Sequence, residues 1–176
     1  MKIGFCGTMS VGKTTLVNAL KEREEFKDYT FTTERSKYLR DLGIPLNTDS
    51  TLKGQTIFLA ERCSELLQEN IITDRTVIDV MAFTKVAKSI PFIQVDDYFT
   101  LAANFIKEYD YIFYISPKGV QMEDNGVRET NLEYRNKIDF EIKDILTYYS
   151  HKIRNIHELS GSTEERVEKV ISSIFK

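Results

Sequence analysis

Short apolar runs alternate with longer segments in which apolar residues recur at helical spacing. The short runs predict strands at residues 2–6, 29–33, 71–74, 111–115 and 151–156. The longer segments predict helices at residues 12–24, 34–42, 49–69, 79–88, 96–107 and 131–150, and a last helix that opens at a Ser162–Glu165 capping box. This alternation predicts an α/β three-layer sandwich, in which a five-stranded parallel sheet has helices on both faces. Such sheets bind ligands at the carboxyl ends of their strands.

Length and composition narrow the class of protein. The chain has 176 residues without an internal repeat or a Pro/Gly/Ser-rich linker, which predicts a single domain over residues 1–176. A formal net charge of −3 argues against nonspecific binding along nucleic acid. No apolar run is long enough to span a bilayer and residues 1–5 lack the features of a signal peptide, so we expect a cytoplasmic protein without membrane contact. Cys6 and Cys63 lack metal-ligand spacing and are expected to be buried free thiols.

The most specific pattern follows the first predicted strand. Residues 7–14 match G-x-x-x-x-G-K-[ST], a loop whose glycines let backbone N–H groups surround phosphates at the start of a helix. Lys13 is expected to reach the β- and γ-phosphates of ATP, and the Thr14 hydroxyl to bind Mg²⁺. The predicted nucleotide-binding residues of this segment are Gly7, Thr8, Met9, Ser10, Val11, Gly12, Lys13, Thr14 and Thr15.

A carboxylate at the end of a second buried strand is the expected partner of this loop. Asp74 ends the apolar run Ile71-Ile72-Thr73 and would hold Mg²⁺ through a water molecule. The alternative is that Asp74 caps the N-terminus of the next helix, which is common after a strand.

Beyond the phosphate loop, the sequence resembles the nucleoside and nucleotide kinase branch of P-loop proteins. Residues 56–62 (TIFLAER) and 72–76 (ITDRT) are similar to the helix–strand unit of thymidylate kinases and deoxynucleoside kinases. Residues 32–35 (TTER) are similar to the segment after the second strand of those enzymes. Residues 123–128 (EDNGVR), with Arg135 following, look more like the ribosylnicotinamide kinase domain.

The resemblance implies roles for three side chains near the transferred phosphoryl group. Glu34 would act as a base or orienting carboxylate for an acceptor hydroxyl, and Arg75 would neutralise charge on the phosphoryl oxygens. Arg62 would bind the acceptor, or the phosphate of a monophosphate acceptor. The alternatives are that Glu34 is an acidic residue at a helix start and that Arg62 lies on a solvated helix face.

The polar stretch at residues 117–136 is a candidate lid. In small-molecule kinases a segment at this place closes over ATP and excludes water. Arg128 and Arg135 would then contact the phosphates, whereas the alternative is an ordinary surface loop with scattered charges.

These features predict an ATP- and Mg²⁺-dependent kinase that acts on a small nucleoside or nucleoside monophosphate. A second hypothesis, less favoured because no basic cluster demands it, is a kinase that phosphorylates a hydroxylated base in DNA. A third is a nucleotide-dependent ATPase or switch that acts on a partner. The pattern leaves a homodimer open, and it leans towards a nucleoside as the acceptor.

Overall fold

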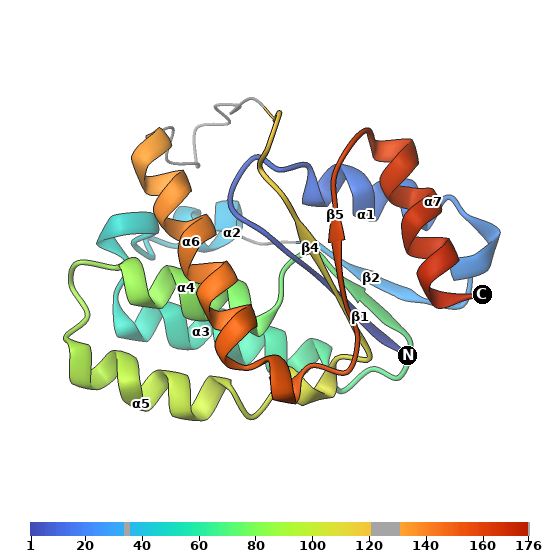
Figure 1. The fold of residues 1–176 in the computed structure, drawn as a ribbon. Coiled ribbons are helices and arrows are strands. Elements are labelled where there is room, and N and C mark those ends of the chain that lie inside the picture. The colour runs from blue at the N-terminus through green and yellow to red at the C-terminus, as the bar shows by residue number, and fades with distance from the viewer. Residues whose placement is uncertain (34–35, 121–130, 176) are drawn as a thin grey trace.

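The structure is a computed structural model that describes residues 1–33, 36–120 and 131–175. Within these ranges, parallel strands form one sheet in the order β2-β3-β1-β4-β5 (Figure 1). The strands are β1 (Lys2–Cys6), β2 (Thr30–Thr32), β3 (Ile71–Thr73), β4 (Tyr111–Ile115) and β5 (Ile156–Leu159). The predicted α/β fold with a five-stranded parallel sheet is confirmed.

Helices cover both faces of the sheet. The α-helices are α1 (Lys13–Lys21), α2 (Ser36–Asp41), α3 (Leu52–Glu65), α4 (Val77–Val86), α5 (Phe92–Ala102), α6 (Leu132–Tyr148) and α7 (Thr163–Ile174). Short 3-10 helices lie at Glu24–Phe26, Asn47–Asp49, Ile106–Glu108 and Ser150–Lys152. Helices α1 and α7 pack together on one face, whereas α4 packs with α3, α5 and α6 on the other (Figure 1).

Alternate residues of the strands belong to two separate hydrophobic cores. In β1, Ile3 and Phe5 pack into the core beneath α1 and α7, whereas Cys6 faces the core beneath α4 and α6. Burial on both faces explains why the central strands are almost continuously apolar. Cys6 is therefore buried as predicted, but Cys63 on α3 is only half-buried, and both thiols are free.

The predicted fifth strand at residues 151–156 is wrong. Residues 150–152 form a 3-10 helix, and the strand runs from Ile156 to Leu159. It pairs with β4 at the edge of the sheet, where Ile156 and Glu158 are exposed. An edge strand needs only part of its surface to be apolar, so the pattern IHEL lacks the apolar run that the central strands show.

Helix starts are set by capping more than by the apolar period. Helix α4 begins at Val77, earlier than the predicted residue 79, because Thr76 accepts the Ile78 N–H and caps it. At α7 the predicted capping box is confirmed: Ser162 Oγ accepts the Glu165 N–H, and Glu165 accepts the Ser162 N–H. None of the helices within the described ranges has the length and apolar character that crossing a membrane requires.

Candidate functional site

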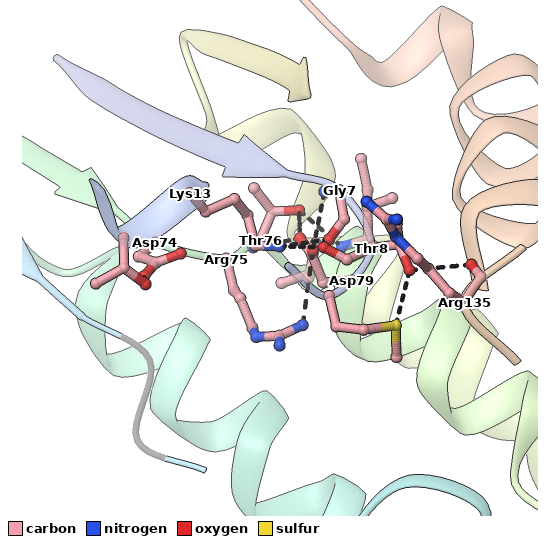
Figure 2. A network of polar contacts seen from close by, with 12 residues as sticks. Gly7, Thr8, Lys13, Asp74, Arg75, Thr76, Asp79 and Arg135 are labelled. Atoms are coloured by element: carbon pink, nitrogen blue, oxygen red, sulfur yellow. Dashed lines mark hydrogen bonds and ion pairs between the residues drawn. The ribbon is translucent and has the colours of Figure 1, made fainter. Parts of the chain in front are cut away.

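The register of β1 and β3 brings the phosphate loop next to Asp74. Gly4 pairs with Thr73, so both strands end at the same edge of the sheet and the residues that follow them meet there. Figure 2 shows the resulting network, in which Lys13 from the start of α1 lies between the loop and the segment after β3. The sequence-predicted residues Lys13, Thr14, Asp74 and Arg75 are thus brought together.

The loop from Gly7 to Gly12 depends on backbone conformations that favour glycine. Gly12 has a φ of 84°, in the left-handed region, directly before α1. Gly7 has a φ of 154°, and a Cβ atom there would lie 2.8 Å from the carbonyl oxygen of Ile115. Both fixed glycines of the pattern are therefore required by the shape of the loop itself.

The ammonium group of Lys13 lies inside the loop. Its Nζ donates to the carbonyl oxygens of Gly7 (2.5 Å) and Thr8 (2.8 Å), and the side chain is buried. Burial, followed by the nearby charge of Arg75, lowers the pKa of Lys13 to about 8, although the charges of Asp79 and Asp74 oppose the change. The cation is therefore held by neutral carbonyl groups in a site that disfavours its charge.

Thr14 and Asp74 provide two hard oxygen atoms side by side. The Thr14 hydroxyl donates a hydrogen bond to Oδ2 of Asp74, which is buried. The backbone N–H of Asp74 donates to Thr32 at the end of β2, which fixes the position of the carboxylate. Thr76, not Asp74, is the N-cap of α4, so the capping alternative for Asp74 is wrong. This pair suits Mg²⁺, which prefers oxygen ligands.

Arg75 is held in an unusual pose beside this pair. Its φ is 142°, which is rare for a residue with a side chain. The guanidinium lies over the ring of Phe83, 4.9 Å from its centroid, and its NH1 is 3.9 Å from Oδ1 of Asp79. The side chain is mostly buried and belongs to the same network as Lys13 (Figure 2).

Asp79 is a central member of the site that the sequence interpretation missed. It is fully buried and accepts the N–H of Gly7 at Oδ1 (3.1 Å). Its Oδ2 accepts both the N–H (2.8 Å) and the hydroxyl (2.9 Å) of Thr76. The T-x-x-D spacing of a capping box was the available signal, but it gave no indication of the contact with Gly7.

The end of the candidate lid that the structure describes lies against the phosphate loop. Arg135 on α6 is buried, its carbonyl oxygen accepts the Thr8 hydroxyl (3.0 Å), and its NH1 donates to the carbonyl of Val120 (2.8 Å). Burial lowers the pKa of Arg135. The predicted residues Arg128 and Glu34 lie outside the described residues.

Arg166 also contacts the loop, from the side opposite to Arg135. It is a buried arginine that the sequence interpretation missed. Arg166, in the first turn of α7, donates from NH1 to the carbonyl of Val11 (2.7 Å). The same nitrogen lies 3.3 Å from the position of a Cβ atom at Gly12. No local pattern links residue 166 to the loop, because 155 residues separate Arg166 from Val11.

Arg62 is engaged in an internal ion pair. It is only 2% exposed, and its NH2 lies 2.6 Å from Glu65 and 3.9 Å from Glu61 on the same helix. Burial raises the pKa of Glu65 to about 7, and the charge of Arg62 opposes this change. The alternative that Arg62 lies on a solvated helix face is therefore wrong.

The phosphate loop, placed between the first strand and first helix of this parallel sheet, defines a P-loop protein. The sequence matches the AAA_28 family, described as an AAA domain, over residues 2–166, and the chain belongs to that family. No curated protein matches the sequence.

Several solved structures share the fold. Deoxyadenosine kinase from M. mycoides with bound dCTP is 19% identical with a TM-score of 0.69, and the match covers 99% of this chain and 98% of that one. The NadR protein in complex with NR is 18% identical with a TM-score of 0.74, covering 97% of this chain and 50% of NadR. Shikimate kinase from Aquifex aeolicus is 18% identical with a TM-score of 0.58, covering 99% and 96%. The fold is thus that of P-loop small-molecule kinases, and the predicted resemblance is confirmed.

Replacement of Arg62 by alanine is expected to destabilise the protein by about 3–5 kcal/mol, because the partly buried carboxylates of Glu61 and Glu65 would lose their buried partner. Urea denaturation followed by circular dichroism measures this change. The matched control is Arg23→Ala, which breaks the surface ion pairs of Arg23 with Glu25, Glu164 and Glu168 and should reduce the stability much less. If both variants instead lose equally little stability and only Arg62→Ala weakens acceptor binding, Arg62 would be assigned to binding the acceptor.

Nucleotide binding is expected to drive proton uptake by Lys13 in alkaline solution. At about pH 9 only about a tenth of Lys13 is protonated in the free protein, and phosphate groups would restore its charge. Calorimetry with MgATP in buffers of different ionisation enthalpy should show uptake of nearly one proton at about pH 9 and about a tenth of that at pH 7.

The same pKa has a consequence for stability without nucleotide. The unfolded chain binds more protons than the folded protein between pH 8 and the ordinary lysine pKa of 10.5. The contribution of Lys13 to the free energy of unfolding therefore rises with pH over this window.

The calorimetry decides whether Lys13 has this low pKa. Proton uptake on MgATP binding that is the same at pH 7 and at about pH 9 would contradict it.

Proposed function

We propose that this protein is an ATP- and Mg²⁺-dependent kinase that transfers the γ-phosphoryl group of ATP to a small nucleoside or nucleotide. The observation that carries the proposal is the convergence of Lys13, Thr14, Asp74 and Arg75 at the carboxyl ends of β1 and β3. The fold shared with deoxyadenosine kinase and shikimate kinase supports it.

The protein's own contribution to such a reaction is chiefly electrostatic. Lys13 would exchange its bonds to the loop carbonyls for the β- and γ-phosphate oxygens, which match its charge. Arg75, pre-set beside Lys13 by Phe83 and Asp79, would offset the charge that develops on the transferred phosphoryl group. Both cations lie in a buried site, where such interactions are stronger than in water.

Thr14 and Asp74 would hold the magnesium ion. The hydroxyl and the carboxylate already lie within hydrogen-bonding contact, so the residues present fit an oxygen-coordinated cation. When bound, Mg²⁺ would neutralise charge on the β- and γ-phosphate oxygens. We propose that residues 117–136 form a lid over ATP and that Arg128 and Arg135 act within it. The hydrogen bond between the Thr8 hydroxyl and the Arg135 carbonyl oxygen supports this proposal for the part of the segment that the structure describes.

A nucleoside with a free hydroxyl is the proposed acceptor. A monophosphate acceptor needs arginines to hold its phosphate, and Arg62, the candidate for that task, is already paired with Glu65. A nucleoside needs a carboxylate near the γ-phosphate to receive the hydroxyl proton, and Glu34 is proposed for this role.

Phosphoryl transfer from ATP to a panel of nucleosides, nucleoside monophosphates and duplex DNA tests the proposed function. Wild-type protein is expected to phosphorylate a nucleoside, and Lys13→Ala should lower kcat by roughly 10²–10³-fold because charge in the transition state loses its partner.

The matched control is Lys21→Ala, at the exposed end of the same helix, which should keep full activity. Full activity of a folded Lys13→Ala variant would contradict the proposal. Phosphoryl transfer to DNA alone would instead indicate a kinase that acts on a base in DNA. ATP hydrolysis without any acceptor would indicate an ATPase or switch.

A further inference from the structure

The carboxylate of Asp79 joins two parts of the site that are far apart in the sequence. It lies on α4 and has no solvent exposure. One oxygen, Oδ1, meets the N–H of Gly7 at the start of the phosphate loop and faces NH1 of Arg75. The other, Oδ2, is occupied by Thr76, the residue after Arg75. Figure 2 shows these contacts converging on Asp79.

Helix capping alone does not account for this arrangement. A capping box requires only the contact of Asp79 with the N–H of Thr76, and Oδ2 provides it. Oδ1 points instead to the phosphate loop and to the guanidinium of Arg75. A buried carboxylate is costly unless its oxygens are satisfied, and here the partners of Oδ1 both belong to the candidate site.

Arg75 needs such support because its conformation is unfavourable. Its positive φ is a strained conformation for a residue with a Cβ atom, and the surrounding structure must offset that strain. Phe83 contacts the face of the guanidinium, whereas the carboxylate of Asp79 lies at its edge. A rigid position matters for a cation that is to meet a transferring phosphoryl group, because small displacements weaken the interaction strongly.

We infer that Asp79 is a positioning residue that holds Arg75 at the γ-phosphate side of the loop and ties this arginine to Gly7. Asp79 does not touch substrate; it acts through Arg75. The inference rests on the proposed function, because it takes the γ-phosphate of ATP as the group that Arg75 meets.

The test compares the affinities of MgADP and of magnesium with a non-hydrolysable ATP analogue, AMP-PNP, by calorimetry. Their ratio reports contacts made to the γ-phosphate and needs no acceptor. Asp79→Asn keeps the shape of the side chain and removes its charge, and is expected to reduce the preference for AMP-PNP by about tenfold. In an Arg75→Gln background the same substitution should change this preference little, because the group through which Asp79 acts is already gone.

Two further variants separate positioning from folding. Asp79→Glu keeps the charge and should retain more of the AMP-PNP preference than Asp79→Asn, and it also serves if the Asn variant does not fold. Glu141→Gln is the matched control, because Glu141 is also a buried carboxylate. Its Oε2 lies 2.6 Å from Nζ of Lys85, which is on the same helix as Asp79. It should leave the preference unchanged.

The possible results lead to different conclusions. Equal weakening of MgADP and AMP-PNP binding by Asp79→Asn, or losses that are independent of Arg75, would overturn the positioning role and leave a structural cap. Wild-type protein that binds neither nucleotide would instead refute the proposed function, and this inference with it.

Discussion

The site depends on the mutual neutralisation of buried charges where β1 and β3 end side by side. Lys13 and Arg75 supply positive charge, and Asp74 and Asp79 supply negative charge, in a place largely closed to water. None of these charges could be buried alone without a large cost in free energy. The parallel register of the two strands is therefore what makes the site possible, and the charged side chains in turn hold the phosphate loop to the segment after β3.

The interactions of Lys13 indicate how the site can respond to phosphate. Its ammonium group donates hydrogen bonds to two uncharged carbonyl oxygens, and its burial disfavours the charged form. An anion within the loop would favour that charged form. Arg135 and Arg166 contact the loop from α6 and α7 respectively, so helices on both faces of the sheet hold it in shape.

The sequence predicted the parts of the molecule that local patterns determine. The central strands are apolar because they are buried on both faces, and the residues of the phosphate loop are contiguous, so its backbone requirements are visible in the pattern. The β5 strand was misplaced because an edge strand carries polar residues. Asp79 and Arg166 were missed because their roles follow from partners 72 and 155 positions away. The burial of Arg62 depends on how α3 packs, which its helical spacing could not show.

We propose that the Thr14–Asp74 pair and the phosphate loop form one site for ATP with magnesium. Calorimetric titration of ATP into wild-type protein and Asp74→Asn, with and without Mg²⁺, tests whether they do. Magnesium is predicted to tighten ATP binding in the wild type, and this gain should fall by about tenfold or more in the variant. If ATP binds equally tightly with and without magnesium, or if Asp74→Asn leaves the gain intact, Asp74 and Thr14 do not form a magnesium site.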